Sequence, residues 1–234
     1  MSNNSPAFNQ GLQTGVVKQL TGDPDNLFRV LVTLTSASEE ITDVWARIAN
    51  LYATNHAGMV FLPEVGDEVL ISFIGGDEEQ AVILGSLFGR TNKCLVAATE
   101  NNAIKSITTK NQLQINFDDN NKSIEIKTPD GNKITISDND GGIVIEDMNA
   151  NSVQLSSTGI SLRSNGDINL DAKGSININA NTNVKVKADA GNIMLKGVNI
   201  VNQANASFKA TGQAQAELSA SGQTVVKGAI VMIN

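Results

Sequence analysis

Aromatic side chains are scarce in this 234-residue chain, at 4% of residues, and only 18% of residues are charged. Aromatic side chains bury the largest apolar area per residue, so a chain this poor in them has little material for one large core. The sequence also lacks any apolar run of about 18 residues, which excludes a membrane-spanning helix. Such a composition is not that of a single compact globule.

Cysteine and histidine each occur once. Cys94 cannot form an intrachain disulfide, which fits synthesis in a reducing compartment, and we interpret it as a small buried or linker residue. His56 alone cannot build a multi-histidine metal site, and it would be the sole candidate for a histidine-based triad. We interpret it as a loop residue and expect no metal and no cofactor.

Positive charge is in deficit, with 17 basic against 24 acidic residues and a net charge of −7. This balance argues against a general affinity for nucleic acid or anionic membranes, which normally requires a basic face. The start of the chain, MSNNSPAFNQ, lacks the basic and apolar segments of a signal peptide. We therefore expect assembly in the cytoplasm.

Strand-like runs separated by turn residues fill the first part of the chain. They number five over about 75 residues, with one long connection after the third, which is typical of a small OB-type barrel. We predict a flexible N-terminus over 1–11 and an OB-fold domain over 12–90. The five predicted strands are Gly15–Leu20, Phe28–Thr35, Asp43–Ala49, Glu68–Phe73 and Ala81–Leu87.

An internal repeat dominates the rest of the sequence. After a predicted linker over 91–110, apolar pairs two residues apart recur every nine to ten residues through 111–159, where the predicted β-helix starts. From 160 to 234 the spacing tightens to eight residues. Because eight is even, a strand-like path keeps the same side chains inward in every repeat.

One such chain has too little to bury, since each octad offers about two aliphatic side chains and open backbone edges. Three intertwined copies solve both problems, whereas a one-chain solenoid remains the structural alternative. The predicted fold is therefore all-β, an OB barrel followed by a homotrimeric, intertwined triple-stranded β-helix that acts as a needle. The predicted trimer core consists of Ile160, Leu162, Ile168, Leu170, Ile176, Ile178, Val184, Val186, Ile200, Phe208, Leu218 and Val226.

Two places break the alternation. Ile193, Leu195 and Val201 put apolar groups at outward positions, which predicts a bulge or register change near Gly191 or Gly197. The C-terminus is apolar at both inward and outward positions, so it is either the closing knot of the trimer or a docking platform for a separate cap protein. The residues predicted for docking are Val225, Ile230, Val231, Met232, Ile233 and Asn234.

Clustered carboxylates are the other candidate site. Glu64, Asp67 and Glu68 stand close together in PEVGDEV, where a metal or acid–base role competes with a simple turn at Gly66. FDDNN and SDNDGG contain several acidic residues but lack the spacing of a calcium-binding loop. We interpret all three as turns, assign no catalytic, cofactor or metal residue, and expect no enzyme activity.

Residues 44–93, VWARIANLYATNHAGMVFLPEVGDEVLISFIGGDEEQAVILGSLFGRTNK, resemble the OB domain of VgrG and phage baseplate assembly protein V, the central spike family. TGVVKQLTGDPDNLFRVLV is similar to the family's opening strand pair, INFDDNNKSIEIKTPDGNKITISD to the start of its β-helix, and the octads to its needle. The likeness covers roughly residues 12–234. VgrG proteins usually begin with hub domains that this sequence lacks, so a separate protein would supply them or the sequence is a piece.

The resemblance implies a piercing spike of a contractile injection machine: a type VI secretion system, an extracellular particle or a phage baseplate. It also implies a PAAR-type tip protein at the C-terminal end, hub, tube and baseplate proteins at the N-terminal side, transient contact with the target membrane, and delivery outside the cell. Two alternatives stay open. One is a receptor-binding trimeric fibre; the other is an OB module that binds nucleic acid or glycan through Trp45, Tyr52 and Phe61, although the charge disfavours nucleic acid. For Trp45 and Phe61 we expect instead a place in the OB core or at the trimer contact.

Overall fold

The computed structural model describes residues 11–35 and 42–233. The chain divides into two compact units, Met1–Asn169 and Leu170–Asn234, and each is described by itself. In the described residues, two 3₁₀ helices are the only helical elements. The elements are β1 (Gln13–Gln19), β2 (Val30–Leu34), β3 (Asp43–Ile48), β4 (Ala53–Thr54), β5 (Ala57–Gly58), β6 (Glu68–Phe73), η1 (Ile74–Gly76), η2 (Glu78–Gln80), β7 (Ala81–Ser86), β8 (Ile104–Thr108), β9 (Gln114–Asp118), β10 (Ser123–Lys127), β11 (Lys133–Ser137), β12 (Gly142–Glu146), β13 (Ser152–Ser156) and β14 (Gly159–Arg163).

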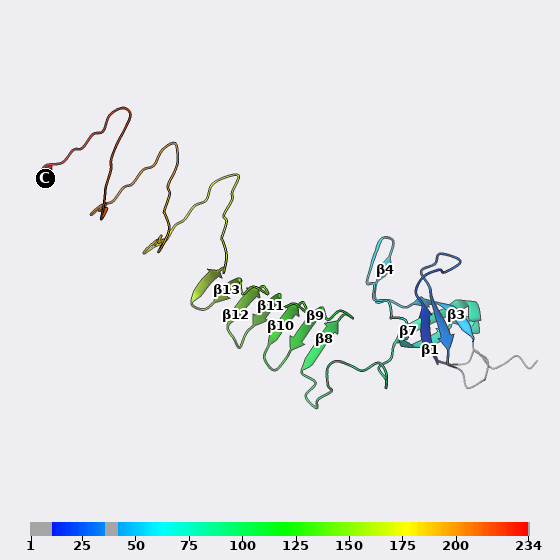
Figure 1. The fold of residues 1–234 in the computed structure, drawn as a ribbon. Helices are drawn as coiled ribbons and strands as arrows, with labels where there is room; N and C mark the ends of the chain where they lie inside the picture. The colour runs from blue at the N-terminus through cyan, green and yellow to red at the C-terminus, as the bar shows by residue number, and fades with distance from the viewer. Residues whose placement is uncertain (1–10, 36–41, 234) are drawn as a thin grey trace, which may run out of the picture. The chain divides into compact units, whose positions relative to one another are not determined.

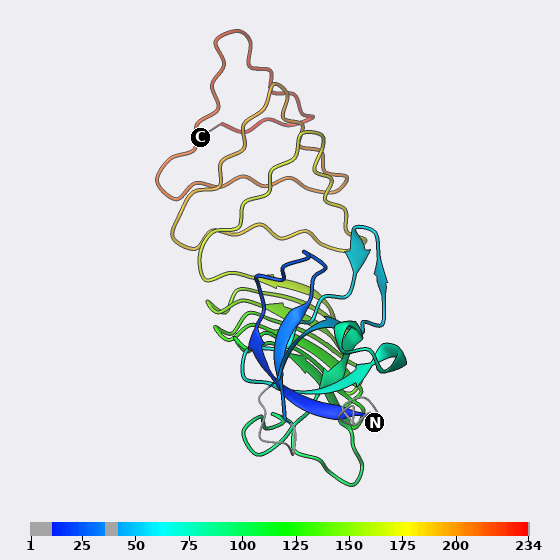
Figure 2. The same cartoon turned by 90° about the vertical axis from the view of Figure 1, so that its right-hand side faces the viewer.

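Five strands close into a barrel in the order β1-β2-β3-β7-β6, drawn in blue and cyan in Figures 1 and 2. The pair β3–β7 is parallel and the other four are antiparallel, which is the strand order of an OB fold. Alternation along each strand sends one set of side chains inward, as in β6, where every second residue is buried. The barrel core consists of Val17, Val30, Val32, Leu34, Val44, Ala46, Val69, Ile71, Phe73, Ala81 and Ile83. The predicted five-stranded barrel is confirmed.

The long connection after β3 carries a small hairpin, β4–β5, in which Thr54 pairs with Ala57. Asn55 and His56 form its two-residue turn, and His56 has a φ of 58°, a left-handed conformation that histidine adopts more readily than most side chains. The single histidine therefore lies in a turn, which agrees with its interpretation as a loop residue.

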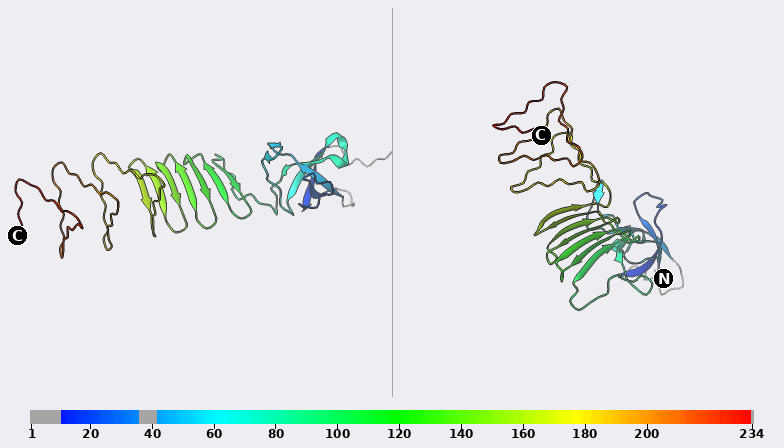
Figure 3. Two further views of the ribbon diagram at one scale, coloured as in Figure 1. Left: turned by 90° about the horizontal axis from the view of Figure 1, so that it is seen from above. Right: turned by 60° about the vertical axis from the view of Figure 1, so that its left-hand side comes forward.

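Seven strands, β8 to β14, form an antiparallel meander in which each strand pairs with its sequence neighbours (Figures 1 and 3). Strand β8 lies inside 91–110, so the sheet begins within the segment predicted as a linker. Strand β14 contains Ile160 and Leu162, so the first predicted octad still belongs to this sheet. Pairing over Ile104–Arg163 is within one chain, so in the entry region the strands pair differently from the exchange between chains expected for the octad needle.

Beyond β14 the chain follows a different path, the trace that Figure 2 colours yellow to red. It is extended and bends at regular intervals, with bends at 165–166, 173–174, 181–182, 189–191, 198, 205–206, 213–214, 221–222 and 229–230. The bends are about eight residues apart, as the octad pattern predicts. Between Ser164 and Ile233 the structure has no strand and no pairing of one segment with another.

Candidate trimerisation surface

One face of the seven-stranded sheet is apolar and open to solvent. In β10, Ile124 and Ile126 are exposed, whereas Ser123, Glu125 and Lys127 on the opposite face are half-buried. Cross-strand pairs extend this apolar face from strand to strand, for example Ile124 with Ile136 and Ile126 with Ile134. Its exposed members are Ile107, Phe117, Ile124, Ile126, Ile134, Ile136, Ile145, Leu155, Ile160 and Leu162. This is the reverse of an ordinary globular sheet, in which the apolar face is covered.

The octad segments likewise leave their large apolar side chains exposed to solvent. In the segments up to residue 200, the residue two places after the bend is about half exposed: Ile168 50%, Ile176 54%, Val184 55% and Ile200 52%. The residue four places after the bend is more open: Leu170 68%, Ile178 71% and Val186 72%. We call these the first and second positions of a segment. Phe208, Leu218 and Val226 occupy the same positions further along and are 65–78% exposed.

A lone chain gains nothing that would hold it on this path. Ordering each residue costs about 1–2 kcal/mol of backbone conformational entropy. Here neither apolar burial nor strand pairing offsets that cost within residues 164–233. Partner strands at the usual spacing of about 4.8 Å would supply both, because the unpaired backbone groups and the apolar row repeat together.

A side-chain network ties the end of the sheet to the first bend. Asn151 accepts hydrogen bonds from the Ser164 hydroxyl at 3.1 Å and from the Asn165 backbone N–H at 2.8 Å. Its amide nitrogen donates to Asp147 Oδ2 at 2.8 Å. This donation, together with the backbone N–H groups of Asn151 and Asn149, lowers the pKa of the Asp147 carboxyl. The network fixes where sheet pairing stops and the octad path starts.

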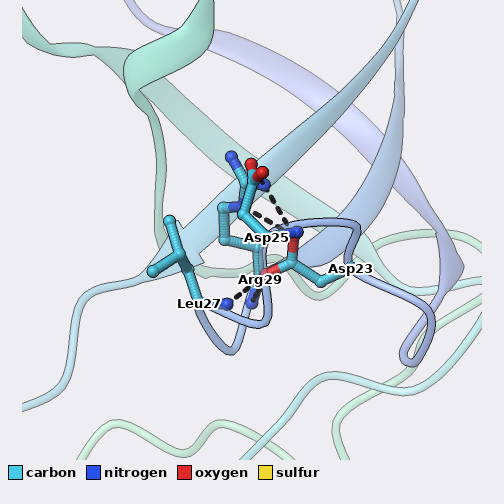
Figure 4. Close-up of polar contacts among 4 residues, drawn as sticks. All are labelled: Asp23, Asp25, Leu27 and Arg29. Atoms are coloured by element: carbon cyan, nitrogen blue, oxygen red, sulfur yellow. Dashed lines mark hydrogen bonds and ion pairs between the residues drawn. The ribbon is translucent and has the colours of Figure 1, made fainter.

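The barrel carries one nearly buried ion pair, in the loop between β1 and β2 (Figure 4). Arg29 Nη2 lies 2.6 Å from Asp23 Oδ1, and the two side chains are 12% and 7% exposed. Asp23 Oδ2 also accepts from the backbone N–H of Leu27 at 2.8 Å. Arg29 and these backbone donors hold the pKa of Asp23 far below its ordinary value, although partial desolvation opposes the shift. Asp25 also pairs with Arg29 at the rim of the loop. All of these groups are engaged in holding the loop.

The carboxylates of PEVGDEV likewise serve structure. Asp67 accepts from the Glu64 N–H at 2.8 Å and from the Asn92 side-chain amide at 3.2 Å, while Glu64 pairs with Lys110 at 2.9 Å. Gly66, with a φ of 96°, makes the turn. In residues 11–35 and 42–233, no group of three or more His, Cys, Asp or Glu side chains is placed to hold a metal ion.

The aromatic residues considered for the binding module do not fill the barrel. Tyr52 and Phe61 are exposed, and Trp45 lies half-buried on the outward side of β3. Placement of Trp45 and Phe61 in the barrel core, one of two expectations for them, is therefore wrong, and contact with another chain is the expectation that remains. Cys94 is exposed rather than buried, in the segment between β7 and β8. No helix within the described part of the chain is long and apolar enough to cross a membrane.

The residues predicted for tip docking lie open at the end of the path. Val225 and Val231 are about half exposed, and Ile230, Met232 and Ile233 are more than three-quarters exposed. Asn234 lies outside the described residues. Their role in docking stays a prediction.

Comparison with known families agrees with this division of the chain. Residues 13–88, which contain all five barrel strands, match the type VI secretion system and phage-baseplate injector OB domain. Residues 123–187 match the phage baseplate V C-terminal trimerisation domain. The chain belongs to the VgrG and phage baseplate V family. A homotrimer is the assembly that the trimerisation domain supports, and eight of the twelve predicted core residues lie inside the matched segment.

Among curated proteins the chain is similar to type VI secretion system spike proteins. VgrG3 of Vibrio cholerae is 32% identical over 90 residues, which cover 37% of this chain and 9% of that protein. VgrG5 of Pseudomonas aeruginosa is 32% identical over 90 residues, covering 36% and 11% respectively, and VgrG1a of the same organism is 27% identical over 85 residues, covering 35% and 13%. The matched segments thus span about a tenth of these relatives, which are type VI secretion system spike proteins by name.

The predicted core starts at Ile160 and so includes only Ile160 and Leu162 of the apolar face of the sheet. The signal was present in the sequence as the pairs Ile124/Ile126 and Ile134/Ile136. What only the structure shows is that these pairs share one face and that no other part of residues 11–35 and 42–233 covers this face.

Proposed function

We propose that three copies of this chain form the needle and collar of a spike that a contractile machine drives through a target envelope. The observation that carries the proposal is the octad path: it bends every eight residues, keeps its large apolar side chains exposed, and has no strand pairing of its own. Three chains wound together would bury the apolar rows on a common axis and pair every segment with a partner. A rod closed in this way has no free edge at which axial load would start unravelling.

The barrels would form the collar that transmits force to the shaft. This follows from the match of residues 13–88 to an injector OB domain, and from the named role of the relatives as spike proteins. The exposed C-terminal cluster defined by Val225, Ile230, Val231, Met232 and Ile233 would seat a PAAR-type tip protein. Hub, tube and baseplate proteins would bind at the barrel side.

The test is the mass of the purified full chain, measured by light scattering at micromolar concentration. We expect a trimer that resists mild detergent, and a monomer would overturn the proposal. The paired substitution Ile176→Ser and Ile178→Ser removes two inward aliphatic side chains per chain and should dissociate or strongly destabilise the trimer. The matched control, Asn177→Ser with Asn179→Ser, changes the outward neighbours in the same segment and should leave the mass unchanged.

A further inference from the structure

The octad path contains one segment whose register differs from the others. The bend before it spans three residues, 189–191, and the bend after it is the single residue Val198, whereas the other seven bends span two residues each. The first of these bends is one residue longer than usual, which shifts the following segment by one place. The second bend is one residue shorter than usual, which restores the original register. The structure thus places the register change at both of the glycines at which it was predicted, Gly191 and next to Gly197.

Side-chain exposure shows which residues turn inward in this segment. Ile193 and Leu195, two and four places after the bend, are 54% and 71% exposed, which are the values of the first and second positions in the three preceding segments. Met194, between them, is 82% exposed, Val201 is 83% and Val198 is 100%. Ile193 and Leu195 therefore take core positions in place of Asn192 and Met194. The shift leaves Met194, Val198 and Val201 on the outside.

These three side chains make an apolar interruption in an otherwise polar outer face. Over the regular octads from 161 to 191, no outward position carries an apolar side chain. Threefold assembly would place nine such groups at one level of the needle. We call this ring, Met194, Val198 and Val201 of each chain, the belt. A ring of exposed aliphatic groups marks an interaction site rather than ordinary surface.

Lysines surround the belt. Residues 185–209 contain Lys185, Lys187, Lys196 and Lys209 against a single acidic residue, Asp189, a local net charge of +3 in a chain whose total is −7. Lys187 pairs with Asp189, and both are largely exposed. Lys196 faces outward because of the same register shift that exposes Met194. The acidity of the whole chain, which argued against anionic membranes, therefore does not hold for this stretch.

We propose that the belt is a membrane-contact site that binds anionic phospholipid bilayers, with the aliphatic groups in the acyl boundary and the lysines on the headgroup phosphates. Aliphatic groups flanked by lysines are the composition of interfacial membrane anchors. Lysine stems also lie readily along an apolar surface while the ammonium stays at the headgroups. This inference rests on the trimeric spike of the proposed function, because the ring exists only if three chains wind together.

Vesicle flotation with the full chain tests the proposal. We expect the trimer to float with vesicles of phosphatidylcholine containing phosphatidylglycerol, and much less with pure phosphatidylcholine. Substituting Met194, Val198 and Val201 together with Ser should lower partitioning at least tenfold and leave the trimeric mass intact. Substituting Lys185 and Lys196 with Gln should lower it by about fivefold per lysine, since each contributes about 1 kcal/mol near an anionic surface.

Two controls separate this proposal from the trimer itself. Serine substitutions at Asn169, Asn177 and Asn179, outward residues of a regular stretch, should change neither binding nor mass. Ile193→Ser with Leu195→Ser should destabilise the trimer. A belt variant that no longer forms the trimer would show that the belt faces inward and overturn the proposal, as would a wild-type trimer that ignores anionic vesicles. A wild-type monomer would instead overturn the trimeric spike.

Discussion

At the scale of single residues, Asp23 shows how one carboxylate organises a loop. It accepts from the Arg29 guanidinium and from the backbone N–H groups of Asp25, Leu27 and Arg29. Phe28, within the same loop, has a φ of 60°, a conformation that a bulky side chain adopts only where its surroundings impose it. The ionised form of Asp23 is the one that these donors stabilise.

Asp23→Asn should therefore lower the melting temperature at pH 7. The pKa of Asp23 is lower in the folded state than in the unfolded state, where it is about 3.9. Its contribution is complete above about pH 4 and is lost as the pH falls through the folded-state pKa. The difference between wild type and variant should narrow progressively below about pH 4, as measured by thermal denaturation across pH. The control Glu79→Gln changes an exposed carboxylate in η2 and should shift the melting temperature little at any pH. If the difference in melting temperature between wild type and Asp23→Asn did not depend on pH, this account would be contradicted.

At the scale of elements, the decisive contrast is between two apolar sheets. The barrel closes on itself and buries Ile71 and Ile83 almost completely, whereas the meander β8–β14 leaves its isoleucines open. The alternation of apolar and polar residues is similar in both. The difference is that the barrel's strand order is circular, while the meander has only its neighbouring strands and no opposing layer among the described residues.

Ile136→Ser tests this assignment for the meander. If partner chains cover the apolar face, the substitution removes a buried aliphatic side chain and should cost about 1.5–3 kcal/mol for each copy. Thermal dissociation of the trimer, followed by light scattering, should shift to a lower temperature. The neighbouring change Thr135→Ser, on the opposite face of β11, should have a much smaller effect. Equal effects of the two changes would show that the apolar face stays open to solvent.

At the scale of the whole molecule, two modes of strand pairing follow one another along the chain. Strands pair within the chain up to Arg163, and from Ser164 to Ile233 the chain has no strand pairing of its own. In the proposed trimer, partner chains would supply that pairing and the core, so folding and trimer formation would be one event. We predict that a tip partner binds at the exposed C-terminal cluster of this path.

Removing residues 225–234 should leave the trimer intact and abolish binding of a tip partner. Most of the predicted core residues precede the deletion, whereas it removes every predicted docking residue. Light scattering checks the mass, and a pull-down with a purified PAAR-type protein checks the binding. Loss of the trimer would show that this segment is the closing knot of the core instead. Retained binding would place the tip partner elsewhere.

The sequence by itself determined the five barrel strands, the octad and the small residues at most of its bends. These depend on alternation and turn chemistry, which are local properties of neighbouring residues. It also located the disturbed register near Gly191 and Gly197, because apolar residues there occupy both inward and outward positions.

Only the tertiary structure decided that the strands over Ile104–Arg163 pair within the chain, and that Ile193 and Leu195, rather than Met194, turn inward. A two-residue alternation is the same whether the neighbouring strand belongs to the same chain or to another. The inward direction of a shifted segment depends on how many residues each bend takes up, and a bend is a property of backbone geometry. The partner strand and the number of residues in a bend are both set by the three-dimensional path of the chain. Hydrophobic periodicity along the sequence carries no information about either.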